Sequence, residues 1–297
     1  MTATGSKAQK RQVWTVVELI RWTTGYLEEK GFEDARLQVE RLLAHVLGCD
    51  RVGLYLQFDR PLTPEELGSF KTLLKRRLAH EPLQYVLGEC EFRGLRLKVD
   101  RRVLIPRPET EQLVDICLNL FAGKAPARVL DVGTGSGNIV LTLAMEWPQT
   151  EFVAVDVSPG ALELATENAK ALGLEGRVRF LQADVFANEF PRRVGGEFGL
   201  VVSNPPYVRP DEWPTLQPEI TQYEPKEALV SEPDGLRFYR RLAELGPQLN
   251  SEDGWLVVEV GDSQAADVRA IFQTKGFAEV TVHRDLAGRD RVVAGRR

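Results

Sequence analysis

The stretch RVLDVGTGSGN, residues 128–138, decides the fold of this chain. It joins a short apolar run to three glycines at alternate positions, Gly133, Gly135 and Gly137. Glycines in a turn between a strand and a helix permit positive φ angles, and they let a ligand approach the backbone where a Cβ atom would collide with it. The stretch therefore predicts a buried strand, a tight turn that can hold a ligand, and a helix after the turn.

The alternation of strand and helix continues along the chain from about Glu109 onward. Short apolar runs predict strands at ARVLDVG, TEFVAVDV, RVRFLQADV, GLVVSNPPY, GWLVVEVG, FAEVTVHR and RVVAG. Helical patterns lie between them, at residues 137–146, 159–172, 235–249 and 263–275. Buried strands that alternate with helices are typical of a parallel sheet with helices on both faces. We therefore predict an α/β fold of the Rossmann-like class, with a mainly parallel seven-stranded sheet and a reversed last strand at an antiparallel edge.

The chain before this region carries helix signals instead. Thr15 with Glu18 is a capping-box signature, and Thr63 caps another helix whose first turn contains a proline. The segment EFRGLRLKVD then alternates apolar and polar residues about Arg93 and Gly94, which predicts a β-hairpin. We expect a helical bundle at residues 1–85, a hairpin linker at 86–108 and the sheet domain at 109–297.

The composition is that of an ordinary globular protein. A hydrophobic fraction of 43% and a charged fraction of 27% exclude a disordered or fibrous class, and 297 residues suggest about two domains. Cys49, Cys90 and Cys117 are isolated from one another, so we expect reduced thiols in the cytoplasm rather than a disulfide framework or a zinc site. No apolar run is long enough to cross a bilayer, and the start, MTATGSKAQKRQ, is expected to be a frayed tail rather than a secretory signal.

Three carboxylates end three successive predicted strands: Asp131, Asp156 and Asp184. Each one alone is more simply an N-cap or a solvated turn residue. A dinucleotide site would read G-x-G-x-x-G, but the third position counted from Gly133 is Asn138, so a bound pyrophosphate is not expected. Together the acids suit a nucleoside without phosphates, in which Asp131 faces a cationic amino acid group, Asp156 accepts the ribose hydroxyls and Asp184 reaches an exocyclic amine.

This combination resembles the S-adenosylmethionine site of class I methyltransferases, in which a D-x-G-x-G-x-G turn wraps the methionine end and the second-strand acid holds the ribose. The resemblance implies the cofactor-binding residues Gly133, Thr134, Gly135, Ser136, Gly137, Asp156, Asp184, Val185 and Asn204. Several relatives have a tryptophan at the position of Val185, where this chain is expected to offer adenine an aliphatic contact.

The fourth predicted strand ends in VVSNPPY, residues 201–207. Prolines stop strands, so a plain loop signal is one interpretation. The alternative is a site for a planar nitrogen substrate: the side-chain carbonyl of Asn204 can accept one N–H of an NH₂ group, and the backbone carbonyl of Pro205 the other. Pro206 keeps this backbone rigid, and Tyr207 offers a ring face to a planar amide.

Orienting a nitrogen lone pair toward a methyl donor is catalysis by positioning, and no general base is expected. The predicted catalytic residues are Asn204, Pro205 and Tyr207, and the predicted substrate-binding residues are Asn204, Pro205, Pro206 and Tyr207.

The tetrapeptide NPPY resembles the motif of amino-methyltransferases that act on adenine in DNA, guanine in ribosomal RNA or glutamine in protein, and it does not choose among them. Over a wider span the chain resembles the HemK/PrmC family of glutamine-N5 methyltransferases. The matching stretches are EPLQYVLGECEFRGLRLKVD, VLIPRPETEQLVD, DVGTGSGNI, SNPPYV, YEPKEAL, DGLRFYRRL and DLAGRDRVV. The resemblance implies S-adenosylmethionine-dependent methylation of the glutamine in the GGQ loop of peptide chain release factors, by a cytoplasmic monomer whose N-terminal bundle recruits the substrate.

Two other functions stay open on the sequence. A nucleic acid methyltransferase acting on adenine N6 or guanine N2 would be expected to carry a basic cleft, yet the formal net charge is −5, and 25 basic residues face 32 acidic ones after Tyr85. Direct nucleic acid binding is therefore not expected. A scaffold that binds a nucleoside without chemistry would have no need of NPPY.

The remaining polar features have simpler interpretations. The segment IPRPETE, residues 105–111, is either an inter-domain brace or a substrate-facing loop, and Arg107 is a candidate ion-pair partner of a neighbouring glutamate. His45, His80 and His283 lack the spacing of metal ligands, so no metal is expected.

Overall fold

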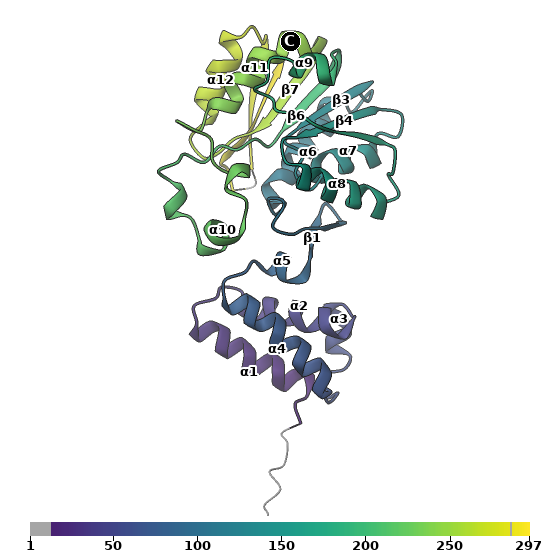
Figure 1. Ribbon diagram of the computed structural model, residues 1–297, viewed down its shortest axis with the longest axis vertical. Coiled ribbons are helices and arrows are strands. Elements are labelled where there is room, and N and C mark those ends of the chain that lie inside the picture. Colours follow the sequence, from purple (N-terminus) through teal and green to yellow (C-terminus); the bar gives the residue numbers. More distant parts are fainter. Residues whose placement is uncertain (1–12, 286) are drawn as a thin grey trace, which may run out of the picture. The chain divides into compact units, whose positions relative to one another are not determined.

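The computed structural model of the protein describes residues 13–285 and 287–297 (Figure 1). The chain divides into two compact units between Leu87 and Gly88. The basic start MTATGSKAQKRQ, expected to be a frayed tail, lies outside the described residues. No helix in the described part of the chain has both the length and the apolar character needed to cross a membrane.

The first unit is a helical bundle, as its sequence predicts. Its helices are α1 (Val16–Glu29), α2 (Ala35–Leu47), α3 (Arg51–Tyr55), α4 (Pro64–Leu78) and α5 (Leu83–Leu87). Both predicted N-caps are present: Thr15 forms a capping box with Glu18, and Thr63 forms one with Glu66. Each cap satisfies backbone N–H groups that the first turn of a helix leaves unpaired. The apolar faces meet in one core that includes Leu27, Leu42 and Phe70.

The second unit begins with the predicted hairpin, β1 (Glu89–Phe92) and β2 (Leu95–Lys98). Its two-residue turn has φ angles of 47° at Arg93 and 75° at Gly94, and positive φ at both positions is the geometry that joins twisted antiparallel strands. The hairpin was expected to be a linker but is part of the second unit. The backbone N–H of Lys98 donates to the side chain of Asn168 at 2.7 Å, and Phe92 belongs to the core beneath the sheet.

Seven strands form the sheet of the second unit. They are β3 (Arg128–Val132), β4 (Glu151–Asp156), β5 (Val178–Gln182), β6 (Phe198–Ser203), β7 (Asn250–Glu259), β8 (Glu279–Arg284) and β9 (Asp290–Arg296), in the order β5-β4-β3-β6-β7-β9-β8. The first five are parallel, and β9 pairs antiparallel with both β7 and β8. The predicted reversed last strand is confirmed, but it lies between β7 and β8, so β8 is the edge strand on this side of the sheet.

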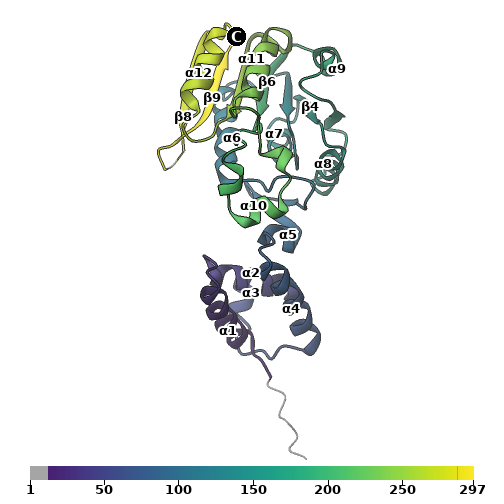
Figure 2. The same cartoon turned by 60° about the vertical axis from the view of Figure 1, so that its left-hand side comes forward.

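Helices cover both faces of this sheet. They are α6 (Pro108–Leu120), α7 (Asn138–Glu146), α8 (Pro159–Ala171), α9 (Phe190–Val194), α11 (Arg237–Leu249) and α12 (Ala265–Thr274). Consecutive strand residues point to opposite faces, so Val129 packs in the core with α6 and α7, and Leu130 packs in the core with α11 and α12. Figure 2 shows α12 lying along β8 and β9. Burial on both faces explains why these strands are continuous apolar runs.

The chain order reverses between β3 and β6. From β3 the chain proceeds to β4 and β5 on one side, and β6 then begins the other side next to β3. In open α/β sheets, ligands bind outside the carboxyl ends of the strands at this kind of switch point. We therefore expect the ligand site among the residues that follow β3, β4 and β6. The sequence predicts no helix or strand between β6 and α11. The structure has the short helix α10 (Pro218–Tyr223) in this segment.

Candidate active site

Three of the predicted site segments meet at the carboxyl edge of the sheet. Asp131 of β3 pairs in register with Ala154 of β4 and with Val202 of β6. The glycine turn after β3, Asp156 at the end of β4 and the NPPY segment after β6 therefore project from neighbouring strands. Their distance along the sequence is large, and the parallel sheet brings them together.

The glycine turn adopts the backbone that its sequence predicts. The φ angles of Gly133, Gly135 and Gly137 are 76°, 54° and 81°, values that residues with a Cβ atom rarely adopt. A Cβ atom placed on Gly133 or Gly135 would meet nothing within 4 Å, so the space above them is open to a ligand. At Gly137 a Cβ atom would lie 2.9 Å from the side chain of Leu141. The third glycine therefore serves the packing of α7.

Asp131 is a buried carboxyl group at the base of this turn. It is 0% exposed, and its Oδ2 atom accepts a hydrogen bond from the Thr134 hydroxyl at 2.7 Å. Its Oδ1 atom is buried and makes no hydrogen bond of normal geometry with the residues that the structure describes. Burial, and next the charge of Asp156, raise the pKa of Asp131 to about 7, although the Thr134 hydroxyl and the Val140 N–H oppose the shift. A cation bound beside this oxygen would compensate the buried charge.

Asp156 is held over the turn by backbone donors. Its Oδ2 atom accepts from the N–H of Gly135 at 2.9 Å, and its Oδ1 atom accepts from the N–H of Ser158 at 2.9 Å. Burial raises the pKa of Asp156, and these N–H groups oppose the rise. Each carboxylate oxygen has a further acceptor site. Asp156 therefore retains acceptor capacity on both oxygens beside the turn.

The residues that follow β5, the third predicted strand, show fewer features of a ligand site than those after β3 and β4. Asp184 is exposed, and its Oδ1 atom accepts from the N–H of Phe186 at 2.9 Å, which is a local turn contact. Val185 is 5% exposed and belongs to the core packed against α11, so its side chain has little surface for the expected contact with adenine. The partly buried aromatic ring near this strand end is Phe186, with the Arg237 guanidinium 3.9 Å from its centre.

The NPPY segment begins with an asparagine whose amide is oriented by the protein. The Nδ2 atom of Asn204 donates to the Thr110 hydroxyl at 3.0 Å, and that hydroxyl donates to Oε2 of Glu259 at 2.6 Å. Because the nitrogen of the amide faces Thr110, its carbonyl oxygen points the other way. The sequence alone indicated Asn204 but neither Thr110 nor Glu259 as its partners.

Glu259 is, with Thr110, one of two candidate site residues that the sequence did not indicate. It ends β7, it is 1% exposed, and burial raises its pKa to about 7. The Thr110 hydroxyl, Arg291 and Asn204 oppose this rise, and Glu109 adds to it. The only local signal in the sequence is an acid inside the apolar run GWLVVEVG. Carboxyl groups are rarely buried without a partner or a role.

Tyr207 is fixed at both ends of its backbone. Its N–H donates to the carbonyl of Leu229 at 3.1 Å, and its carbonyl accepts from Nε2 of Gln264 at 3.0 Å. A Cβ atom on Gly261 would lie 3.0 Å from the Tyr207 ring, and one on Gly235 would lie 2.5 Å from its carbonyl oxygen. Burial raises the pKa of Tyr207, with Glu259 adding to the rise. The ring is thus held in place as a neutral phenol. Pro205 before it is buried, and Pro206 is half-buried.

The segment IPRPETE braces this corner from within the second unit. Arg107 forms an ion pair with Glu224 at 2.6 Å, and the N–H of Ile105 donates to the same carboxylate at 3.2 Å. The partner of Arg107 is therefore a glutamate of the YEPKEAL stretch rather than one of its neighbours in sequence. These contacts of Arg107 and Ile105 join two parts of the second unit. In the described ranges, no group of three His, Cys, Asp or Glu side chains is arranged to hold a metal ion.

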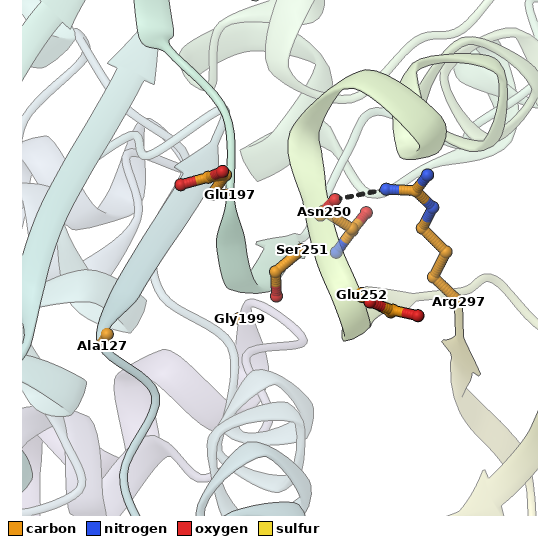
Figure 3. A pocket seen from close by; sticks show the side chains of 7 residues that line it. All are labelled: Ala127, Glu197, Gly199, Asn250, Ser251, Glu252 and Arg297. Carbon is orange, nitrogen blue, oxygen red and sulfur yellow. Dashed lines mark hydrogen bonds between the residues drawn. The ribbon is translucent and has the colours of Figure 1, made fainter.

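A surface pocket lies at the end of the sheet opposite to the glycine turn (Figure 3). Its volume is about 430 Å³, and residues at the start of β6 and β7 line it together with Arg297, which donates to the carbonyl of Asn250 at 2.7 Å. The pocket adjoins the amino ends of the strands, where none of the predicted site residues lies. It therefore belongs to a different region from the glycine turn and NPPY.

Two protein families match the two units of the chain. The PrmC N-terminal domain matches residues 18–88, and the family described as a methyltransferase domain matches residues 129–223. The second match includes the glycine turn, Asp156 and NPPY.

Relatives match nearly the whole chain. The chain is 45% identical over 290 residues to the release factor glutamine methyltransferase of Geobacter sulfurreducens, covering 97% of this chain and 99% of that one. It is 43% identical to the release factor glutamine methyltransferase of Chlorobaculum tepidum, covering 95% and 97%. Among solved structures, a methyltransferase from Pyrococcus furiosus shares the fold at 16% identity, with a TM-score of 0.51 over 76% of this chain and 95% of that chain.

Proposed function

The chain belongs to the release factor glutamine methyltransferase family, and we propose that it methylates the side-chain amide nitrogen, N5, of the glutamine in the GGQ motif of peptide chain release factors. The observation that carries this proposal is the orientation of Asn204. Its carbonyl oxygen is turned away from Thr110 at the edge of the sheet that also holds the glycine turn. An acceptor fixed in this way suits an NH₂ group as substrate.

The residues of the turn fit S-adenosylmethionine as the cofactor. The open space above Gly133 and Gly135 admits a ligand close to the backbone. The buried Oδ1 atom of Asp131, which lacks a hydrogen bond of normal geometry among the described residues, suits a cationic amino acid end. Asp156 would accept the ribose hydroxyls, while Thr134, Ser136 and Gly137 complete the turn, and Asp184 with Val185 would lie nearest the base. When bound, the cofactor supplies a methyl group on a sulfonium sulfur.

The chain's own residues act by positioning the substrate amide. A carboxamide nitrogen is a poor nucleophile because its lone pair is delocalised into the carbonyl group. The Asn204 carbonyl accepts one N–H of the substrate and the Pro205 carbonyl accepts the other, which fixes the NH₂ group and directs the lone pair toward the methyl group. Tyr207 packs its ring against the planar amide, and Pro206 keeps the corner rigid. The substrate nitrogen would release its proton to water after it has gained the methyl group, so the transfer itself needs no general base.

The first unit is proposed to recruit the release factor. Large apolar side chains lie exposed on it, among them Trp22 at 55%, Val52 at 65% and Leu56 at 84%, which supports a protein-binding role. We expect the enzyme to act in the cytoplasm as a monomer.

The test is a methyl transfer assay with the purified full chain and methyl-labelled S-adenosylmethionine. Each reaction contains a release factor, the same factor with the GGQ glutamine changed to alanine, or ribosomal RNA and DNA. We expect label on the GGQ peptide of the first protein and none on the alanine variant. Label on nucleic acid alone would support the nucleic acid alternative, and no label on any acceptor despite cofactor binding would support the scaffold; either result refutes the proposal.

A further inference from the structure

Three side chains form a hydrogen-bonded chain behind the NPPY corner. Glu259 at the end of β7 accepts from Thr110 of α6, and Thr110 accepts from Asn204 after β6. Glu259 and Thr110 are each 1% exposed, so neither group exchanges its partner for bulk water. Three elements that are distant in the sequence thus converge on one amide.

The direction of these hydrogen bonds decides which way the Asn204 amide faces. A threonine hydroxyl has one hydrogen, and Thr110 gives it to the Glu259 carboxylate at 2.6 Å. Its oxygen is then left as an acceptor and bonds the NH₂ end of Asn204. If the Thr110 hydrogen were free, it could donate to the carbonyl of Asn204 instead. The amide would then turn its own NH₂ group toward the substrate NH₂ group, and two donors would face each other.

We propose that Thr110 and Glu259 are positioning residues for methyl transfer, which hold the Asn204 side chain with its carbonyl oxygen toward the substrate nitrogen. This inference rests on the proposed function for the identity of the substrate. Thr110 and Glu259 do not touch the reacting atoms and act through Asn204.

The surroundings of Glu259 allow both of its protonation states near neutral pH. The charged and titratable groups that face it are Arg291 of β9, Glu109 of α6, and the phenols of Tyr207 and Tyr239. Burial dominates and raises the pKa of Glu259 to about 7. The carboxylate accepts from Thr110 and maintains the direction of the chain, whereas a protonated Glu259 can donate to Thr110 and reverse it. Turnover at saturating cofactor should therefore fall as the pH drops below about 7.

The first test compares three threonine substitutions at saturating cofactor and release factor. Thr110→Val removes the hydroxyl with little change of shape and should lower kcat by roughly tenfold or more. Thr110→Ser keeps the hydroxyl and should retain most of kcat. The matched control is Thr150→Val, because Thr150 is 2% exposed and its hydroxyl makes one hydrogen bond of 2.7 Å to the Pro126 carbonyl, far from the site. A kcat for Thr110→Val within twofold of the control would overturn the inference.

A double-mutant cycle then asks whether Thr110 acts through Asn204. In the Asn204→Ala background, Thr110→Val should lower kcat no further, because the amide that it orients is gone. Equal losses in both backgrounds would contradict the inference.

If Thr110→Val does not fold, Glu259→Gln replaces it: the glutamine does not titrate, so the fall in kcat below pH 7 should disappear. Persistence of that fall in Glu259→Gln would also contradict the inference.

A spectroscopic readout separates this inference from the proposed function. The side-chain NH₂ signal of Asn204 can be assigned in nitrogen-15 spectra by its loss in Asn204→Ala. It should shift with a midpoint near pH 7 in the wild-type protein and show no such shift in Glu259→Gln. This result does not depend on methyl transfer. If release factors accept no methyl group, the proposed function fails, but the inference on the orientation of Asn204 can still hold. An Asn204 signal that does not depend on pH or on Glu259 would refute the positioning role.

Discussion

Replacing Asp131 with asparagine should stabilise the ligand-free protein and weaken cofactor binding. Asp131 is 0% exposed, and its Oδ2 atom accepts from Thr134 while Oδ1 lacks a hydrogen bond of normal geometry among the described residues. Asparagine has nearly the same shape and can still accept from Thr134, but it has no charge to desolvate. The amide also lacks the charge that would attract the cationic end of the cofactor.

The size of the effect follows from the pKa of Asp131. Burial raises this pKa from 3.8 to about 7. The folded state therefore binds the proton more tightly than the unfolded state, so stability is highest below pH 3.8 and is lost as the pH rises to about 7. One pKa unit corresponds to about 1.4 kcal/mol, so the ionised group costs at most about 4 kcal/mol above pH 7. We expect Asp131→Asn to raise the free energy of unfolding by roughly 2–4 kcal/mol at pH 8 and by less than half as much at pH 5.

Urea unfolding of both proteins without cofactor, at pH 5 and pH 8, measures this difference. Asp184→Asn is the control, because Asp184 is exposed and its replacement removes no buried charge. Calorimetry should show S-adenosylmethionine binding to Asp131→Asn at least about tenfold more weakly. A variant that is less stable than the wild type at pH 8, or a gain that is equal at both pH values, would refute the account of the buried charge. Unchanged cofactor affinity would refute the role of Asp131 as the partner of a cation.

Three further substitutions test other parts of the site. Asn204→Ala should retain the fold and much of the cofactor affinity but lose most turnover, as measured by methyl transfer to a release factor and by calorimetry; nearly unchanged turnover would contradict its role. Gly137→Ala should lower the free energy of unfolding in urea by about 1–3 kcal/mol, because the new Cβ atom meets Leu141 at 2.9 Å and the φ angle is 81°; no loss would contradict the packing argument. Arg107→Ala should destabilise the protein by about 1–3 kcal/mol, because it leaves the buried Glu224 carboxylate without its ion-pair partner, while Glu109→Ala serves as a control that leaves this ion pair intact.

The sequence predicts those parts of the structure that local patterns determine. The turn at Arg93 and Gly94 predicts the hairpin, because few residue pairs tolerate positive φ at both positions. The glycines of residues 133–137 likewise predict the turn after β3. The position of β9 between β7 and β8 could not be predicted this way, because strand order depends on which long-range pairing buries most surface, and the apolar run RVVAG would suit either place.

The candidate site likewise contains residues that a local pattern indicates and residues that only long-range packing brings together. Asn204 and Tyr207 are indicated by the sequence because the chemistry proposed for them lies in four consecutive residues, and their roles stay predictions. The partners of Asn204 could not be predicted: Thr110 and Glu259 lie 149 positions apart, and only the packing of α6 against β7 brings them together. Thr110 looks like an ordinary residue in the first turn of a helix. An acid in an apolar strand was the single visible sign of Glu259, and the same sign also fits an edge strand exposed to solvent.

Two of the buried carboxyl groups, Asp131 and Glu259, lie on the strands on either side of β6, the strand that Asn204 follows. β6 pairs with β3, which holds Asp131, and with β7, which ends at Glu259. Burial raises the pKa of each group to about 7, so each charge costs folding free energy at neutral pH. Neutral side chains at both positions would give a more stable sheet. Both groups belong to the proposed site, in which Asp131 would face the cationic end of the cofactor and Glu259 would direct the hydrogen of Thr110. Stabilising substitutions at these positions should therefore reduce activity, whereas stabilising substitutions elsewhere in the sheet should not.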